Sequence, residues 1–365
     1  MTANVSSAAG SPPTGTGQLE SIDLGPFELG DGRVLADLTV AYRHDGLAPG
    51  DGPQVVVVHA LTGSADAAGD WWEPLIGPGR ALDTTRFGVL CANLLGGRYG
   101  TTGPTSRDPG ATEGRPYGRN FPAISTRDQA RAQWRLLDAI GIERVALVTG
   151  GSLGGMVALE LAAERPSAID HLVPIAAPAA TGPLAIAWNH IQVSLIDKLG
   201  DAGLGLARQL AMTTYRSEAD FDERFGRRVE EDGRPSIVSY LDHQGDKLVE
   251  RFDGETYRVL AGAMGRHDVG AGRGGLEAIL RTFAASGTRL TGLGIEGDIL
   301  YGPAQVHALV DVATAAGVAA TYRELQSSKG HDAFLVEWDQ LAAILEEGLS
   351  GNGAPQDTSA LIGNW

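Results

Sequence analysis

The stretch Gly150-Gly151-Ser152-Leu153-Gly154 directly follows the apolar run 145–148 and directly precedes a helical pattern over 156–161. A serine in a glycine-rich turn between a strand and a helix is a typical arrangement for a nucleophile, because the turn lifts the hydroxyl clear of the sheet edge. A side chain at 151 or 154 would collide with its neighbours in such a turn. We therefore predict that Ser152 is a nucleophile and that the backbone N–H of Leu153, at the helix start, binds an oxyanion.

The turn alone does not identify a nucleophile, because an ordinary loop in a chain with 51 glycines can show the same pattern. The segments around the turn provide the further evidence. Apolar runs typical of strands buried on both faces occur at 54–59, 87–93, 145–149 and 171–176, and strand patterns return at 289–294 and 319–325. An alternating pattern at 35–42 predicts an edge strand. Amphipathic helices, the clearest at 126–140, separate the runs. This alternation predicts an α/β fold with a mostly parallel, doubly wound sheet.

The strand signal disappears between 181 and 286. In that interval four segments have helical patterns, at 205–214, 218–225, 239–252 and 256–264, with further helices expected at 304–315 and 337–348. We predict a helical lid at 181–286, inserted into a core formed by 19–180 and 287–349. The ends, 1–18 and 350–365, are expected to be tails, the first of them disordered because it is rich in Ser, Gly, Pro and Thr.

Composition narrows the function classes. The 365 residues carry a net charge of −16 and no basic stretch, so a nucleic-acid partner is not expected. The sequence contains no run of about 20 apolar residues of the kind that spans a membrane. Its first residues do not have the pattern of a signal peptide, so we expect the protein in the cytoplasm. The single cysteine, Cys91, forms no disulfide within the chain and has no metal-type spacing to other ligands. We expect it to be buried, and we expect no metal site.

Two further elements complete a catalytic constellation. Asp298 follows the strand pattern at 289–294, and His331 follows the last one. Ser152 needs a base because its hydroxyl is a poor nucleophile at neutral pH, and His331 fits that role. A carboxylate must hold the imidazole in the right tautomer, and we favour Asp298, although it can also be a helix cap and Glu296 is an alternative acid. Asp332 is adjacent to His331 and is not expected to point at its ring.

A second oxyanion donor is expected after an early central strand. The segment 58–63, Val-His-Ala-Leu-Thr-Gly, occupies that place, and we predict that the backbone N–H of Leu61 acts together with that of Leu153. His59 lies in the same segment. We interpret it as ordering the loop, and a role in proton transfer is the alternative.

From about residue 20 to 348, the chain resembles the homoserine O-acetyltransferases, which are enzymes of the α/β-hydrolase type. The motifs that carry the resemblance lie at 59–63, 96–104, 121–122, 127–129, 150–156, 239–241, 244–247, 251–253, 298–301 and 330–335. The resemblance implies an α/β-hydrolase fold and a ping-pong reaction. Ser152 takes the acetyl group of acetyl-CoA, and L-homoserine then accepts it with His331 as the base. Acetyl-CoA is a co-substrate, with no permanently bound cofactor, the product feeds methionine synthesis, and a homodimer through the lid helices is expected.

The same resemblance implies that Arg208, Tyr215 and Asp332 hold the amino acid. The guanidinium of an arginine can bind an α-carboxylate through two hydrogen bonds, and a carboxylate can bind an α-ammonium. Without the resemblance, we would interpret Arg208 as a surface charge of the lid and Tyr215 as an aromatic residue of the core. The chain departs from the family in a short segment at 197–203 and in Arg98, which we place near the acyl-donor channel, where it would favour an anionic donor. A succinyl donor, an L-serine acceptor, a carboxylesterase and a non-catalytic binding protein are the competing hypotheses.

Overall fold

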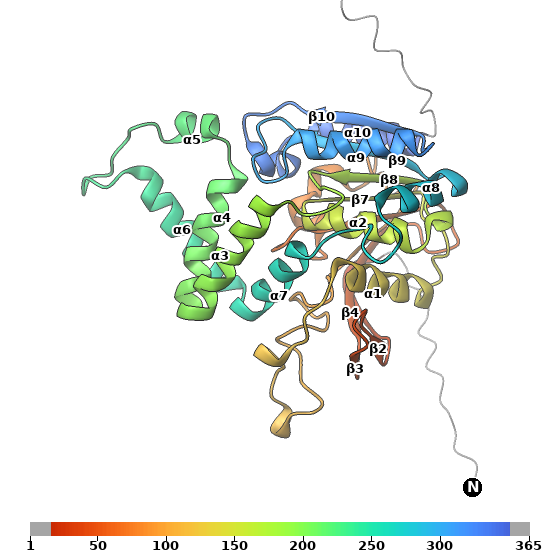
Figure 1. The fold of residues 1–365 in the computed structure, drawn as a ribbon, viewed down its shortest axis with the longest axis horizontal. Coiled ribbons are helices and arrows are strands. Elements are labelled where there is room, and N and C mark those ends of the chain that lie inside the picture. Colours follow the sequence, from red (N-terminus) through yellow and green to blue (C-terminus); the bar gives the residue numbers. More distant parts are fainter. Residues whose placement is uncertain (1–15, 351–365) are drawn as a thin grey trace, which may run out of the picture.

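In the computed structural model, which describes residues 16–350, eight strands form one sheet in the order β1-β4-β6-β5-β7-β8-β9-β10 (Figure 1). The strands are β1 (Thr16–Asp23), β4 (Thr39–Gly46), β5 (Gln54–Val58), β6 (Gly88–Ala92), β7 (Leu147–Gly151), β8 (His171–Ile175), β9 (Arg289–Ile295) and β10 (Ala320–Leu325). The six strands β6, β5, β7, β8, β9 and β10 are parallel, and β4 is antiparallel to β1 and β6. This confirms the predicted α/β class with a mostly parallel sheet.

Helices cover both faces of the sheet. One layer contains α1 (Thr126–Ala139), α2 (Leu153–Glu164), α8 (Leu276–Ser286) and α9 (Pro303–Ala315), and the other contains α10 (Trp338–Leu349) with the short helices η1 (Ala67–Trp71) and η2 (Glu73–Leu75). Side chains of β5 alternate between the two layers, with Val56 and Val58 facing the first and Val55 and Val57 the second. Because every position of β5 is buried, its sequence is a continuous apolar run. Cys91 is buried in the second layer, as predicted.

The amino-terminal side of the sheet differs from the prediction. The strand expected at the edge over 35–42 is β4, which begins at Thr39 and lies between β1 and β6, while the short pair β2 (Phe27–Glu28) and β3 (Val34–Leu35) precedes it. The edge strand is β1, whose first three residues fall inside the predicted tail 1–18. Backbone pairing with β4 stabilises β1, and composition carries no signal for it. The remaining tail residues, 1–15 and 351–365, lie outside the described residues.

A separate helical lid lies to one side of the sheet (Figure 1). It consists of α3 (Pro183–Leu199), α4 (Asp201–Tyr215), α5 (Glu218–Arg224), α6 (Ser236–Arg251) and α7 (Gly254–Gly265). The four helices predicted here are present, and α3 is an additional one. The predicted lid segment 181–286 also includes α8, which packs against α2 and α9 in the core, so we assign the lid to α3–α7. Within residues 16–350, no helix combines the length and the apolar character needed to cross a membrane.

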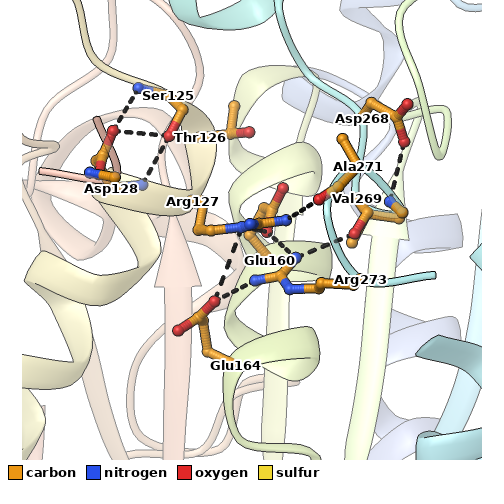
Figure 2. A network of polar contacts seen from close by, with 12 residues as sticks. Ser125, Thr126, Arg127, Asp128, Glu160, Glu164, Asp268, Val269, Ala271 and Arg273 are labelled. Atoms are coloured by element: carbon orange, nitrogen blue, oxygen red, sulfur yellow. Dashed lines mark hydrogen bonds and ion pairs between the residues drawn. The ribbon is translucent and has the colours of Figure 1, made fainter. Parts of the chain in front are cut away.

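A buried carboxylate ties α2 to the segment that leads from the lid back to the core (Figure 2). The Glu160 side chain is 2% exposed, and its Oε2 lies 2.6 Å from Nη1 of Arg273 and 3.6 Å from Nε of Arg127. Glu164, one turn further along, pairs with the same two arginines. Burial raises the pKa of Glu160, and the two arginines act against that shift. These ion pairs hold α2, the helix that follows Ser152, against α1 and the returning segment.

We expect Glu160→Ala to lower the free energy of unfolding by about 3 kcal/mol, because it removes the buried carboxylate and leaves Glu164 as the only carboxylate for both Arg127 and Arg273. Chemical denaturation of the purified variant measures the loss. Glu277→Ala is the matched control, since its ion pair with Arg281 is 63% and 68% exposed and exposed pairs contribute at most about 1 kcal/mol. Equal losses in the two variants would show that the buried pairs do not stabilise α2.

Candidate active site

Four chain segments with candidate catalytic groups meet at one edge of the sheet. Leu61, Ser152, Asp298 and His331 follow β5, β7, β9 and β10, and the carboxyl ends of parallel strands lie at the same edge. A cavity of about 720 Å³ lies at this edge, lined by Leu61, Ser152 and His331 from the core and by residues of α4 and α6 from the lid. The tertiary structure therefore brings the predicted nucleophile and base to one cavity.

The turn that carries Ser152 has the strained backbone of a sharp elbow. Ser152 has φ +59° and ψ −124°, and its N–H donates to the carbonyl of Ile175 at 2.9 Å. A Cβ on Gly154 would lie 2.1 Å from the carbonyl oxygen of Val58, and one on Gly151 would lie 2.4 Å from the Phe334 ring. Neither contact is possible, so the predicted need for glycine on both sides of Ser152 is confirmed.

Asp298 is the carboxylate that is hydrogen-bonded to His331. Its Oδ2 accepts a hydrogen bond from Nδ1 of His331 at 2.7 Å, and its Oδ1 accepts from the N–H groups of Leu300 and Tyr301 at 2.8 and 3.0 Å. The carboxylate is buried, and these bonds fix its direction. Glu296, the alternative acid, is exposed to solvent. The structure therefore pairs His331 with Asp298, as the sequence predicts.

His331 presents its second nitrogen as an acceptor. Its Nδ1–H donates to Asp298, which leaves Nε2 with the lone pair, and this buried atom has no hydrogen-bond partner among residues 16–350. The rings of Tyr215, Tyr301 and Phe334 surround the imidazole, with centroids 5.6–5.8 Å away. Burial lowers the pKa of His331, but the charges of Asp298 and Asp332 outweigh it, and the net shift of the pKa is upward.

The two predicted oxyanion donors lie at the same sheet edge. Leu153 is the first residue of α2, so its N–H has no acceptor within the helix. Leu61 lines the cavity in the turn after β5. His59 accepts from the N–H of Leu94 through Nε2, and its Nδ1–H donates to the carbonyl of Ala60, at 3.1 and 2.8 Å. Burial lowers its pKa to about 4. His59 is therefore neutral with both nitrogens occupied, which supports loop ordering and contradicts proton transfer.

The three residues that the resemblance assigns to an amino acid line this cavity as well. Arg208 and Tyr215 lie two turns apart on α4, and the Arg208 guanidinium carbon lies 5.5 Å from the centre of the Tyr215 ring. Asp332 follows His331 in the short helix η6 (Gly330–Leu335). Arg208, Tyr215 and Asp332 thus place a cation, a phenol and a carboxylate around the space in front of Ser152.

Arg216 is a member of the site that sequence reasoning missed. Its Nε lies 3.2 Å from Oδ2 of Asp332, and its Nη1 lies 3.6 Å from Oδ2 of the fully buried Asp220. Lys329, in the histidine loop, also pairs with Asp220 at 2.9 Å. Burial raises the pKa of Asp332, and Arg216, His331 and Arg208 act against the shift. No local signal links Arg216 to the site, because Asp332 lies more than a hundred positions away and meets it only when the end of α4 packs on η6.

Arg98 does not occupy the place predicted for it. Its Nη1 pairs with Oδ2 of Asp253, just before α7, at 3.2 Å, and the residue does not line the cavity. Its charge is therefore compensated within the lid contact, and it provides no preference for an anionic donor. The short segment 197–203 is the tight connection between α3 and α4, which turns at Gly200.

Comparisons with known proteins show the family of this chain. The model of the alpha/beta hydrolase fold family matches residues 53–258. A homoserine O-acetyltransferase of Moorella thermoacetica is 42% identical over 88% of this chain and 92% of its own length, and that of Thermus thermophilus is 46% identical over 80% of each. The crystal structure of homoserine o-acetyltransferase from Staphylococcus aureus is 29% identical, with a TM-score of 0.77 over 94% of this chain and 98% of its own. The chain therefore belongs to the homoserine O-acetyltransferase family of α/β-hydrolase-fold proteins.

Proposed function

We propose that this protein transfers the acetyl group of acetyl-CoA to the hydroxyl of L-homoserine by a ping-pong mechanism. The observation that carries the proposal is the position of Arg208 and Asp332 in the same cavity as Ser152 and His331. A hydrolase of simple esters has no use for a cation and a carboxylate facing its nucleophile, whereas an amino-acid acceptor requires both. The relatives named above support the same acceptor.

In the first half-reaction, the Ser152 hydroxyl attacks the thioester carbonyl while Nε2 of His331 takes its proton. Asp298 stabilises the imidazolium that forms. The N–H groups of Leu61 and Leu153 bind the oxyanion of the tetrahedral intermediate. The C–S bond then breaks, the thiolate of CoA takes the proton from His331, and the acetyl group remains as an ester on Ser152.

In the second half-reaction, the homoserine hydroxyl attacks the carbonyl carbon of this ester and gives its proton to His331. The bond between Oγ of Ser152 and the acetyl carbon then breaks, Oγ takes the proton back from His331, and O-acetylhomoserine leaves. Arg208 binds the α-carboxylate, with Tyr215 beside it, and Asp332 binds the α-ammonium. Arg216 lies against Asp332 and opposes the effect of burial on its pKa, which favours the charged carboxylate that an ammonium needs. Acceptor binding fills the space in front of Ser152 and excludes water from the acetyl-enzyme, which favours transfer over hydrolysis.

The proposal extends to the setting of the reaction. We propose a cytoplasmic enzyme of methionine synthesis, with acetyl-CoA as co-substrate and without a resident cofactor or metal. We also propose a homodimer through the lid. Exposed large apolar side chains gather on α3, namely Leu184, Ile186, Ile191 and Leu199, and such a group is typical of a protein interface.

The test measures CoA release from acetyl-CoA with different acceptors. We expect fast release with L-homoserine and slow release with L-serine, with water alone, with 3-aminopropan-1-ol, which lacks the carboxylate, and with 4-hydroxybutanoate, which lacks the ammonium. Rapid release without any acceptor would identify an esterase. A faster reaction with succinyl-CoA than with acetyl-CoA, or with L-serine than with L-homoserine, would support the acyl-transfer mechanism but contradict the proposed donor or acceptor.

A further inference from the structure

The cavity has walls of opposite charge. On the core side, Asp66, Asp70 and Arg43 line it, and Arg43 is already paired with Asp45 and Asp66. On the lid side, α6 contributes Lys247 and Arg251. A basic wall in a chain with a net charge of −16 is unexpected unless the cavity takes an anion.

The basic wall is one stripe of α6. The four residues of this helix that line the cavity are spaced as i, i+3, i+4 and i+7, namely Gln244, Lys247, Leu248 and Arg251. Residues at this spacing share one face of a helix. The acidic neighbours Asp246 and Glu250 line a separate small groove between α4 and α6, away from the cavity. On this part of α6, the cations Lys247 and Arg251 therefore face the cavity, and the anions Asp246 and Glu250 face away from it.

Neither cation of this stripe forms an ion pair within residues 16–350. The Arg251 guanidinium donates to the carbonyl of Thr62 at 2.8 Å, to its Oγ1 at 3.2 Å and to the hydroxyl of Tyr99 at 3.3 Å, and all of these acceptors are neutral. The Lys247 side chain is exposed and has no carboxylate within ion-pair distance. Arg43, which also lines the cavity, differs in this respect, since it is paired with Asp45 and Asp66.

We infer that Lys247 and Arg251 form the subsite for the phosphate groups of the acyl donor. The inference rests on the proposed function and deepens it, because it assigns the donor's anionic part to α6. Lys247 acts as an exposed point charge, which suits a phosphate in a wet cavity mouth. Arg251 acts from a fixed position, and it bonds to Thr62, the residue after the oxyanion donor Leu61. Arg208, deeper on α4, remains free for the acceptor's carboxylate.

The test compares two thioester donors in the Lys247→Ala variant. Acetyl-CoA carries three phosphates, whereas S-acetylpantetheine has the same reactive end and none. We expect the KM for acetyl-CoA to rise about tenfold, the lower range for a hydrogen bond between charged groups, and more in Lys247→Glu. The kcat/KM for S-acetylpantetheine and the KM for L-homoserine stay within twofold of the wild type. We expect added salt to raise the KM of the wild type for acetyl-CoA, and to raise that of the Lys247→Ala variant less.

Lys198→Ala is the matched control, because it removes the same charge from an exposed position of the lid outside the cavity. An unchanged KM for acetyl-CoA in both Lys247 variants overturns the inference, and so does an equal loss with both donors. If the wild type fails to use acetyl-CoA at all, the proposed function is wrong. The subsite is then judged by CoA as an inhibitor of p-nitrophenyl acetate hydrolysis, which must weaken in Lys247→Ala if the inference holds.

Discussion

Ser152→Ala will lower the kcat of acetyl transfer by at least about 10³-fold, since loss of the nucleophile leaves only binding and oxyanion stabilisation. Alanine keeps the Cβ and the left-handed backbone of the elbow, so the fold is expected to persist. Steady-state CoA release with L-homoserine measures the loss, and mass spectrometry of the wild type with acetyl-CoA alone is expected to show an added acetyl group that the variant lacks.

Thermal unfolding of Ser152→Ala provides the control, because a midpoint close to that of the wild type separates lost chemistry from lost structure. An activity near that of the wild type would remove Ser152 from the mechanism. An active variant that still gained an acetyl group would place the nucleophile elsewhere in the cavity.

Asp298→Asn will lower kcat/KM by about 10²- to 10⁴-fold, because an amide at this position favours the tautomer in which Nε2 carries the proton and no longer accepts one. The variant also changes the pH profile. The pKa of His331 is raised by Asp298 and Asp332 against the effect of burial, so the wild type loses its base as the pH falls through a value above the usual 6.5. Without the charge of Asp298 the pKa falls, and the acidic limb of kcat/KM moves to lower pH.

Glu296→Gln is the matched control for Asp298→Asn, since it makes the same chemical change two positions away on an exposed side chain. We expect its kcat/KM to stay within twofold of the wild type. A large loss of kcat/KM in Glu296→Gln together with a small loss in Asp298→Asn would identify Glu296 as the acid in place of Asp298. An acidic limb that stays in place in Asp298→Asn would mean that His331 does not titrate in this profile.

Much of the candidate site was predictable because it depends on one local motif and on the ends of parallel strands. A strand, a turn without room for side chains and a helix follow one another within a few residues around Ser152. Asp298 and His331 each follow a strand, and parallel strands bring their carboxyl ends together whatever else the chain does. The order of these segments along the chain was therefore enough to predict the pairing of Asp298 with His331 at 2.7 Å.

Predictions failed where the answer depended on which segments pack together. Composition placed the start of β1 in a tail, because pairing with β4 forms that strand. The alternation at 35–42 does not distinguish an edge strand from the second strand of an antiparallel pair. Arg98 was placed near the donor channel because it departs from the family pattern, and its contact with Asp253, 155 positions away, gave no signal in the sequence.

By itself, the sequence determined the α/β class and the strand–turn–helix elbow at Ser152, since each depends on patterns over short stretches, and it placed the candidate acid and base after successive strands. Only the tertiary structure decided how the charges are distributed in the cavity. It pairs Arg216 with Asp332, and it places Lys247 and Arg251 at the cavity without an ion-pair partner among residues 16–350. The physical reason is that an ion pair depends on a few ångströms between distant segments, and that distance exists only after the lid has packed on the core.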